Sequence, residues 1–352
     1  MLNYDRILQF VDRFLYPVEV MNETRSDGAK FRIFHDKDEM KNMGNVKKVK
    51  LGSSIMMMEE RYLHVDELED ELIQTPFHQF AHNFSVKIMN KIDGRFRFPR
   101  IMGILNITPD SFFHSSRVSS IEKINSFLST SPDIVDVGGE STRPTSDIIN
   151  PEEEQRRLSL FFENTALEKE AKVSIDTRNP STAEIFSGKI HFINDISGFA
   201  SGQMKEVAKK YHKNCIVMHM RGTPQTMNQL THYDDALSET VMFFYNRVSE
   251  LMNYGISPSE ITIDPGIGFA KSPETSAEFI SKAVSFNIGV DVLFGTSRKS
   301  FMGKITGSNV DERLPETIAT SLYLSTKGVD MLRVHDVREN RNALLMLQRL
   351  FL

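Results

Sequence analysis

The stretch Ile101-Met102-Gly103-Ile104-Leu105-Asn106 is a short apolar run that ends in a polar residue, and a helix-compatible segment follows it. The same pattern recurs to the end of the chain and is typical of a βα unit. The eight apolar runs are Ile101 to Leu105, Ile134 to Val137, Val173 to Ile175, Phe192 to Ile193, Cys215 to Met218, Ile261 to Ile263, Val292 to Phe294 and Met331 to Val334. An open, doubly wound sheet usually has fewer strands and a glycine-rich first turn. Eight units in about 250 residues instead predict an α/β fold of the closed (β/α)₈ barrel type.

Polar side chains gather at the ends of these runs. In a parallel barrel the carboxyl ends of the strands meet at one face, where the active sites of this fold are built. A single residue there is often only a helix cap or a loop hydrogen bond. The set combines His, Lys and Arg with carboxylates, which capping does not require, and so predicts a functional face: Asn106, Glu140 to Arg143, Asp176, Asn194, Asp195, His219, Asp264, Ser297 to Lys299, Arg333 and His335.

The composition is that of an ordinary globular protein, with 352 residues, 40% of them hydrophobic, and a net charge of −5. Charges of both signs are interspersed, which disfavours a broad nucleic-acid-binding face. Cys215 is the only cysteine and lies in an apolar run, so we expect a buried thiol, no intramolecular disulfide and a reducing compartment. No apolar stretch approaches the roughly 20 residues that span a bilayer, and residues 1–6 carry no signal-peptide pattern. We therefore expect a cytoplasmic protein that binds neither nucleic acid nor membrane.

Residues 1–97 differ in pattern from residues 98–352, which hold the barrel units. Helical spacing and short strand-like runs both occur there: Leu8, Val11 and Leu15, and Phe77 to Ile92, are spaced like amphipathic helices, and strands are expected near Phe31 to Phe34 and Val46 to Leu51. Met56 to Met58 fits core filling better than a binding surface. We predict a small α+β N-terminal extension, residues 1–97, packed on a barrel of residues 98–352, and the sequence does not indicate what the extension does.

Two segments of the barrel region carry a specific motif: Met102-Gly103-Ile104-Leu105-Asn106-Ile107-Thr108-Pro109-Asp110-Ser111-Phe112 and Asp136-Val137-Gly138-Gly139-Glu140-Ser141-Thr142-Arg143-Pro144. They resemble the two signature segments of the dihydropteroate synthase family. The likeness continues, in family order and at family-like spacing, through Ser174 to Thr177, Ile193 to Asp195, Met218 to Gly222, Asp264 to Phe269, Ser297 to Phe301 and Arg333 to Val337. One such match is weak evidence, whereas the ordered set is specific. The resemblance covers residues 98–352 and leaves the extension unmatched.

The resemblance implies an enzyme that joins 6-hydroxymethyl-7,8-dihydropterin pyrophosphate to p-aminobenzoate, giving 7,8-dihydropteroate and pyrophosphate. It implies pterin-binding roles for Asp176, Asn194, Met218, Asp264 and Lys299. It implies pyrophosphate-binding roles for Asn106, Thr142, Arg143, Arg333 and His335, and p-aminobenzoate-binding roles for Phe112, Thr142, Pro144, Phe269 and Ser297. Asp176, Lys299, Arg333 and His335 are the catalytic groups that it implies, Asn106 is the implied ligand of a Mg²⁺ cofactor, and a homodimer is expected.

These residue types suit that chemistry. Carboxylates and carboxamides in a dry pocket satisfy the amide and amino edge of a neutral pterin ring. Cationic side chains and Mg²⁺ neutralise the charge that develops on departing pyrophosphate, and no protein nucleophile is needed. General barrel geometry would assign Lys299 to phosphate, because phosphate sites often lie after the seventh and eighth strands. The resemblance places Lys299 against the pterin and p-aminobenzoate instead, and we follow the resemblance.

The loop after the first strand departs from the family pattern. Where the family continues Ser-Phe-Ser-Asp-Gly-Gly, this chain has Ser111-Phe112-Phe113-His114-Ser115-Ser116. Serine is costlier than glycine at positive φ, which puts closure of this loop over the substrate in question. We hypothesise that protonated His114 interacts with pyrophosphate oxygens, so that activity falls as the pH rises through ~6.5 and His114→Asp removes the fall. Identical pH profiles for the two proteins would leave His114 as a surface residue only.

Four other functions compete with this interpretation. A metal-dependent barrel hydrolase commonly needs a His-x-His pair at the first strand, which ends here in Asn106; its ligands would have to come from His219, His335, Asp176 and Asp264. A P-loop nucleotide enzyme fails on the glycine spacing of Gly295 to Ser300. A pterin-binding methyltransferase barrel would not need groups for both a pyrophosphate and an aromatic amine. A non-catalytic pterin-binding protein, motivated by the altered loop, would form no product from the two substrates.

Overall fold

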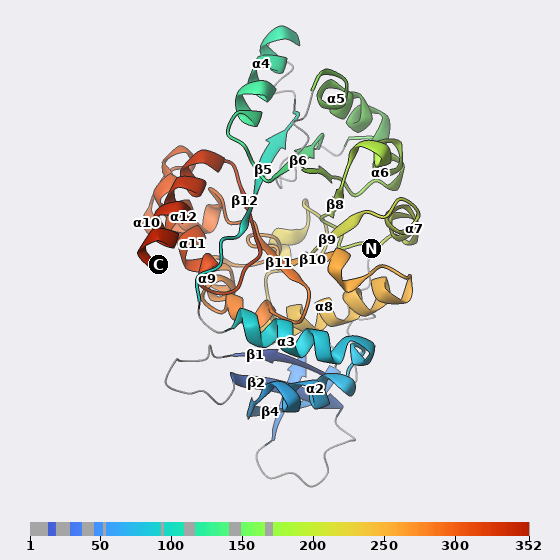
Figure 1. Cartoon of the computed structure of the whole chain (residues 1–352), viewed down its shortest axis with the longest axis vertical. Coiled ribbons are helices and arrows are strands. Elements are labelled where there is room, and N and C mark those ends of the chain that lie inside the picture. The colour runs from blue at the N-terminus through green and yellow to red at the C-terminus, as the bar shows by residue number, and fades with distance from the viewer. Residues whose placement is uncertain are drawn as a thin grey trace.

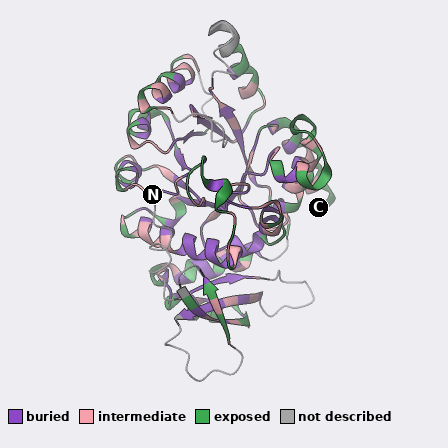
Figure 2. Ribbon diagram, turned by 180° about the vertical axis from the view of Figure 1, so that it is seen from behind, coloured by how far each residue is buried: buried purple, intermediate pink, exposed green. Residues whose placement is uncertain are grey.

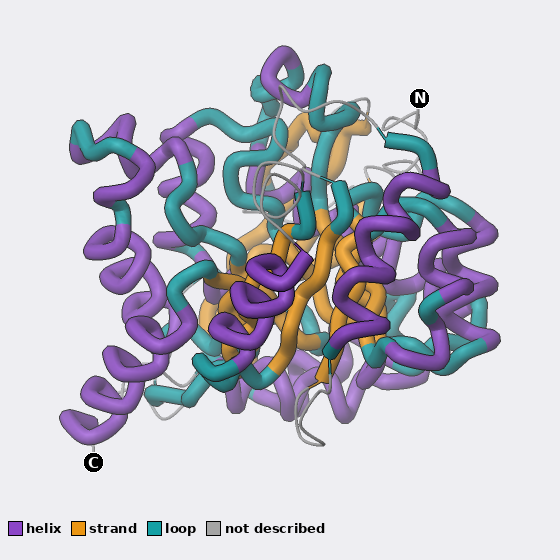
Figure 3. Tube along the Cα trace, turned by 90° about the horizontal axis from the view of Figure 1, so that it is seen from above, coloured by secondary structure: helices purple, strands orange, loops and turns teal. Residues whose placement is uncertain are grey.

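The computed structural model describes residues 13–18, 29–36, 46–51, 54–92, 95–108, 117–140, 149–165 and 172–351. Eight parallel strands close into a barrel in the order β10-β11-β12-β5-β6-β7-β8-β9, and helices surround it (Figures 1 and 3). The strands are β5 (Arg100–Asn106), β6 (Ile134–Gly138), β7 (Lys172–Asp176), β8 (Phe192–Asp195), β9 (Asn214–Met218), β10 (Ile261–Asp264), β11 (Asp291–Phe294) and β12 (Met331–Val334). Each apolar run predicted as a strand lies inside one of these, so the barrel prediction is confirmed.

The connections are helical, as the βα pattern requires. They comprise α4 (Arg117–Leu128), α5 (Pro151–Asn164), α6 (Pro180–Ile185), η3 (Ser187–Lys189), α7 (Gly202–Lys210), η4 (Met227–Gln229), α8 (Ala236–Asn253), η5 (Pro258–Glu260), α9 (Pro273–Ser281), η6 (Ala283–Phe286), α10 (Ser300–Thr306), η7 (Val310–Glu312), α11 (Leu314–Ser325) and α12 (Val337–Phe351). Side-chain caps fix several starts: Asn150, Asp235 and Ser272 accept hydrogen bonds from the first turns of α5, α8 and α9. None of the helices in the described ranges is long and apolar enough to cross a membrane.

The interior of the barrel is built in layers. One buried apolar side chain from each of six strands forms a separate cluster: Met102, Ile134, Phe192, Ile216, Leu293 and Met331. The strands and the inner sides of the helices are buried, as the purple ribbon of Figure 2 shows. Cys215 on β9 is a free, buried thiol, as predicted. Because side chains two residues apart on a strand face the same side, the residues just beyond this cluster also point into the barrel.

The N-terminal extension is a four-stranded antiparallel sheet with two helices. The sheet has the order β1-β2-β4-β3, and its elements are β1 (Arg13–Pro17), β2 (Ala29–Asp36), β3 (Lys47–Leu51), β4 (Ser54–Leu63), α2 (Val65–Ile73), η1 (His78–Phe80) and α3 (Ala81–Lys91). Figure 1 shows α3 lying between this sheet and the barrel. The predicted strands near Phe31 to Phe34 and Val46 to Leu51 are confirmed, and α3 lies within the helical stretch predicted at Phe77 to Ile92.

Two features of the extension differ from the sequence prediction. Leu15 was expected in a helix with Leu8 and Val11, but it lies in β1; Leu8 and Val11 fall outside the described residues. The reason is that β1 is buried on both faces, so its apolar run does not alternate as an exposed strand would. β4 and α2 were not predicted. Met56 and Met58 on β4 are 4% and 9% exposed, which agrees with core filling.

The contacts between the extension and the barrel include those of α3 and those of α8. On α3, Phe84 packs where Gly289 has no side chain, since a Cβ there would lie 2.3 Å from the Phe84 ring. Lys91, in the last turn of α3, is ion-paired with Asp330, the residue before β12. On α8, the Tyr245 hydroxyl donates to the Leu15 carbonyl at 2.8 Å, which joins α8 to the edge strand β1 of the sheet. The extension therefore packs directly against the barrel.

Candidate active site at the carboxyl ends of the strands

The layer above the apolar cluster is polar. Asp136, Asn194 and Arg333 stand two residues beyond Ile134, Phe192 and Met331 on their strands, and so project into the same interior. Arg333 Nε donates to Asp136 Oδ2 at 2.6 Å, and Arg333 Nη2 donates to Asp176 Oδ2 at 2.7 Å. Asn194 Nδ2 donates to the same Asp136 oxygen at 3.0 Å. One guanidinium therefore joins carboxylates from β6 and β7 across the mouth of the barrel.

Burial sets the electrostatics of this group. Burial raises the pKa of Asp176 to about 7, against the opposing effect of the Arg333 charge. Burial disfavours the charge on Arg333 too, but the carboxylates of Asp136 and Asp176 outweigh that and raise the pKa of its guanidinium. Arg333 is thus held charged, while Asp176 titrates near neutral pH. A carboxyl of that kind can accept a hydrogen bond when ionised or donate one when protonated.

A second pair lies across the mouth, on β10 and the loop after β11. Asp264 Oδ1 accepts a hydrogen bond from the backbone N–H of Gly266 at 2.8 Å. Burial raises the pKa of Asp264, and the neighbouring Lys299 opposes that shift. Burial also lowers the pKa of Lys299 to about 8, with Asp264 acting against it. Lys299 Nζ lies 4.6 Å from the centroid of the Phe269 ring and donates to the Ile267 carbonyl, so this lysine is held against an aromatic face.

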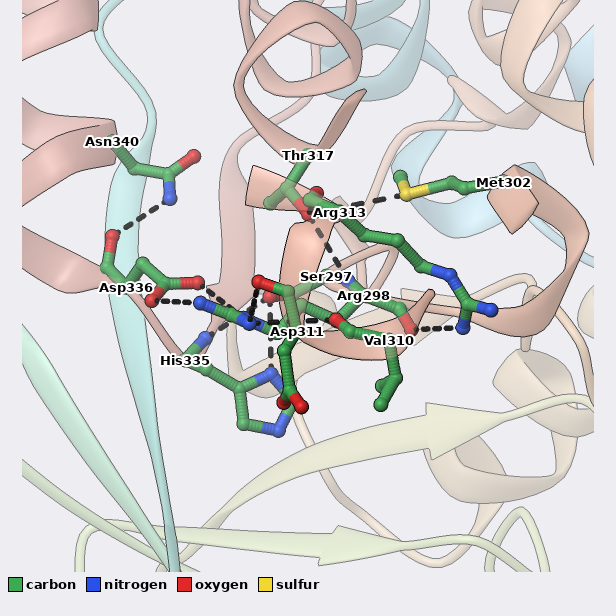
Figure 4. Close-up of polar contacts among 10 residues, drawn as sticks. All are labelled: Ser297, Arg298, Met302, Val310, Asp311, Arg313, Thr317, His335, Asp336 and Asn340. Carbon is green, nitrogen blue, oxygen red and sulfur yellow. Dashed lines mark hydrogen bonds and ion pairs between the residues drawn. The ribbon is translucent and has the colours of Figure 1, made fainter. Parts of the chain in front are cut away.

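The loops after β11 and β12 are tied together, as Figure 4 shows. Arg298 makes a bidentate ion pair with Asp336, with Nε–Oδ2 and Nη2–Oδ1 distances of 2.8 Å each. Its backbone is in the left-handed region, with φ of 55°, a conformation that a non-glycine residue adopts only where its surroundings impose it. The residues directly before this pair are also in contact: the Ser297 hydroxyl lies 3.0 Å from His335 Nδ1 and accepts the His335 backbone N–H at 3.2 Å. The ion pair therefore sets the relative position of Ser297 and His335.

A family model described as "Pterin binding enzyme" matches residues 102–335. The chain belongs to the pterin-binding enzyme family. A bifunctional dihydropteroate synthase/dihydropteroate reductase of Helicobacter pylori is 38% identical over 250 residues, which are 69% of this chain and 65% of that protein. The dihydropteroate synthase of Escherichia coli is 33% identical over 257 residues, 71% of this chain and 91% of that one.

Solved structures agree with these relatives. Xanthomonas albilineans dihydropteroate synthase with 4-aminobenzoic acid has a TM-score of 0.66 at 30% identity, covering 72% of this chain and 93% of that one. The Anaplasma phagocytophilum enzyme with bound 6-hydroxymethylpterin-monophosphate has a TM-score of 0.64 at 30% identity, covering 72% and 99%. Within the pterin-binding enzymes the chain groups with the dihydropteroate synthases, which are transferases, as the sequence predicts. The matched family region lies in the barrel and leaves out the extension.

Most of the residues that the sequence singled out in this pterin-binding enzyme lie together. The structure collects Asp176, Asn194, Asp264, Lys299, Arg333 and Phe269 around the mouth, with Met218 and Asn106 at the ends of β9 and β5 and Ser297 beside His335. Phe112, Thr142, Arg143, Pro144 and His114 lie outside the described residues. The roles assigned to all these residues stay predictions.

Two residues of this pterin-binding enzyme differ from what the sequence suggested. Asp136 was missed, although it is fully buried and contacts both Arg333 and Asn194; the available signal was a carboxylate inside an apolar strand run. His219, one of the ligands that a hydrolase would need, is instead buried beside Lys271, with 3.0 Å between its Nδ1 and Lys271 Nζ. Among the residues described, no three His, Cys, Asp or Glu side chains form a group that could hold a metal.

Proposed function

We propose that this pterin-binding enzyme joins 6-hydroxymethyl-7,8-dihydropterin pyrophosphate to p-aminobenzoate, with release of pyrophosphate. The observation that carries the proposal is the group of buried polar side chains at the barrel mouth, where Arg333 binds Asp176 and Asp136, Asn194 binds Asp136, and Asp264 ends β10. These side chains offer donors and acceptors to a flat heterocycle. Each hydrogen bond is stronger there than in water, because the site is buried. The related structures with bound 4-aminobenzoic acid and with bound 6-hydroxymethylpterin-monophosphate support it.

The pterin would bind in the polar layer. Asp264 would accept hydrogen bonds from the amino and amide edge of the ring, and Asn194 would donate and accept beside it. Asp176, whose pKa is raised to about 7 by burial, can serve as acceptor or donor as the ring requires. Met218, the last residue of β9, is 4% exposed and offers an apolar wall. Lys299 would close the pocket toward the second substrate.

The chemical step breaks the bond between the pterin methylene carbon and the bridging oxygen, and the electron pair leaves with pyrophosphate. The arylamine nitrogen then bonds to the methylene carbon and loses one proton to solvent. Charge develops on the departing oxygens, so cationic groups near them lower the barrier. His335 would supply a hydrogen-bond donor to these oxygens, and Thr142 and Arg143 are further candidates from the sequence. Arg333 is already engaged by two carboxylates, so we propose that it links the pterin pocket to the pyrophosphate end.

Asn106 is the candidate ligand for Mg²⁺. This ion usually takes one or two protein ligands, several waters and substrate phosphates. A Cβ placed on Gly138 would lie 3.4 Å from Asn106 Oδ1 and 3.4 Å from Asp176 Cβ, so glycine leaves room between these two side chains at the ends of β5 and β7. The residues fit Mg²⁺, which Asn106 would hold through its amide oxygen. When bound, Mg²⁺ neutralises charge on the leaving group.

The p-aminobenzoate would stand on the outer side of Lys299. Phe269 presents its ring to the Lys299 ammonium, and an arylamine could pack on the same aromatic wall. Ser297 and its partner His335 offer polar groups for the carboxylate end. Phe112, Thr142 and Pro144 are further candidates by resemblance only. This arrangement would bring the amine toward the methylene carbon from the side away from the pterin edge.

We propose that residues 98–352 are the pterin-binding barrel of the enzyme. We propose that residues 1–97 are a structural part of it and hold no second site. Support comes from α3: Phe84 packs against Gly289 of the barrel, and Lys91 is ion-paired with Asp330. A homodimer and a cytoplasmic location remain expectations from the sequence. Analytical ultracentrifugation of the full chain would test the first, and fractionation of the source cells the second.

A coupled pyrophosphate-release assay tests the proposed function. The enzyme is given dihydropterin pyrophosphate, Mg²⁺ and a panel of arylamines that includes p-aminobenzoate. We expect release that depends on the arylamine and is fastest with p-aminobenzoate. A pterin-binding methyltransferase would bind the pterin and release no pyrophosphate. Binding of both substrates without turnover would support the non-catalytic alternative, and would contradict the proposal.

A further inference from the structure

The segment that follows β10 has an unusual backbone. Gly266 and Gly268 have φ of 68° and 77°, and Ala270 has φ of 50°. Glycine adopts such angles readily, whereas an alanine does so only under constraint. A Cβ on Gly266 would lie 2.1 Å from the His219 carbonyl oxygen, so this segment also runs very close to the end of β9. Something must hold residues 265–271 in this conformation.

Lys271 is placed to do so. Its side chain is buried at 6% exposure, and its Nζ lies 2.9 Å from the Phe269 carbonyl oxygen, 3.3 Å from the His219 carbonyl oxygen and 3.0 Å from His219 Nδ1. These partners come from the segment itself and from the loop after β9. Burial lowers the pKa of Lys271 well below its ordinary value. The two carbonyl contacts need only two N–H groups, so the amine makes them in either protonation state.

A second contact acts on the same segment from the β9 side. The Tyr233 hydroxyl donates to the Ala270 carbonyl at 2.9 Å. The guanidinium of Arg221 lies 4.6 Å from the centroid of the Tyr233 ring, which fixes that ring in turn. The carbonyls of Phe269 and Ala270 are thus bound by side chains of two different residues, on either side of the left-handed alanine.

We propose that Lys271 is a positioning residue that fixes residues 265–271 and thereby the Phe269 ring against Lys299. The inference rests on the proposed function in one respect, namely that the Phe269 wall receives the arylamine. Lys271 acts on Phe269 through the backbone, and on the end of β9 through His219. Loss of Lys271 should therefore loosen arylamine binding more than pterin binding.

The test compares Lys271→Met with a matched control. Lys213→Met also removes an amine that donates to a carbonyl, that of Ile190 at 2.9 Å, but it lies before β9 at the opposite end of the barrel. Lys271→Met should raise the KM for p-aminobenzoate about tenfold, which corresponds to the loss of about one hydrogen bond, and leave the Kd for dihydropterin pyrophosphate within about twofold. Lys213→Met should change neither. An equal rise in both constants for Lys271→Met would overturn the positioning role.

Tyr233→Phe provides a second arm. If Lys271 and Tyr233 hold one segment, the KM effects of Lys271→Met and Tyr233→Phe should combine less than multiplicatively. Once the first substitution has released the segment, the second can raise KM little further. Lys213→Met combined with Tyr233→Phe should give the plain product. Multiplicative behaviour for the first pair would mean that the two side chains act separately, and would contradict the proposal.

A readout without turnover separates this inference from the proposed function. Hydrogen–deuterium exchange should be faster in the peptide of residues 265–272 for Lys271→Met than for wild type, because the Phe269 N–H bonds within that segment, to the Gly266 carbonyl at 3.0 Å. Faster exchange in a protein that shows no arylamine-dependent turnover would contradict the proposed function and support the positioning of the segment by Lys271. Unchanged exchange in an active protein would sink the positioning role alone.

Discussion

Arg333 Nη2 lies 2.7 Å from Asp176 Oδ2 on β7, and Nε of the same guanidinium donates to Asp136 on β6, the strand next to β7. The consequence is that Arg333 cannot be treated as a phosphate-binding arginine alone. It also holds two buried carboxylates in the pocket proposed for the pterin. Substitutions of this arginine are therefore expected to act on stability as well as on binding.

Arg333→Ala should lower the free energy of unfolding by about 3–5 kcal/mol, since it leaves Asp136 and Asp176 without their cation. Arg156→Ala is the control: Arg156 pairs with Glu153 on the surface of α5 and is 59% exposed. The control should cost less than about 1 kcal/mol. Urea denaturation measures both, and equal losses would show that the Arg333 pairs contribute no more than a surface ion pair.

Asp176 should make stability depend on pH in a defined direction. Its pKa is raised to about 7 in the native state, so between the ordinary carboxyl value and pH 7 the native protein holds a proton that the unfolded chain has lost. Its contribution to stability is therefore complete below about pH 4 and is lost as the pH rises to about 7. Asp176→Asn removes this titration. The unfolding free energy of wild type minus that of Asp176→Asn should fall over this range; a difference that stays constant or rises contradicts the assignment.

His335→Ala should weaken binding of the pyrophosphate-bearing pterin by about 1.5–3 kcal/mol, the size of a charge-assisted hydrogen bond. A pterin that lacks the phosphates should bind as it does to wild type. Calorimetry with both ligands measures the difference. Equal losses for the two ligands would remove His335 from the pyrophosphate site.

Asp264→Asn should weaken binding of pterins of every kind, because the carboxylate would become an amide with only one acceptor oxygen facing the pterin edge. The loss should be about 1–3 kcal/mol for a buried partner left poorly matched. Fluorescence titration with a pterin and calorimetry with p-aminobenzoate separate the two substrates. Loss of p-aminobenzoate binding with pterin affinity intact would count against the pterin role.

Lys91→Met tests the role of the extension. Lys91 and Asp330 are both largely buried, with side-chain exposures of 8% and 23%, so removing the cation should cost about 3–5 kcal/mol of unfolding free energy. Lys87→Met, one helical turn earlier, breaks a more exposed pair with Asp291, which keeps Arg100 as a partner, and should cost about 1 kcal/mol or less. Neither change should alter the KM of either substrate. A change in KM without a loss of stability would mean that the extension acts on the active face.

The barrel was predictable because its strands are short, mostly apolar runs and because polar groups stand at or just after their ends. Asp136 was not recognised, since it interrupts such a run and its partners Arg333 and Asn194 come from strands far away in the sequence. Leu15 was assigned to a helix because helical spacing and a strand buried on both faces give the same short apolar pattern. The contact of Lys271 with His219 could not be foreseen either, since it depends on the left-handed backbone of the intervening residues.

The central claim is that the barrel mouth couples loss of pyrophosphate to capture of an arylamine. The most direct measurement follows both products in one reaction, with dihydropteroate identified by mass spectrometry and pyrophosphate measured enzymatically. The account predicts equal amounts of the two products, each requiring p-aminobenzoate, and neither from a reaction that lacks it. Pyrophosphate release at the same rate without p-aminobenzoate, or binding of both substrates with neither product, would contradict it.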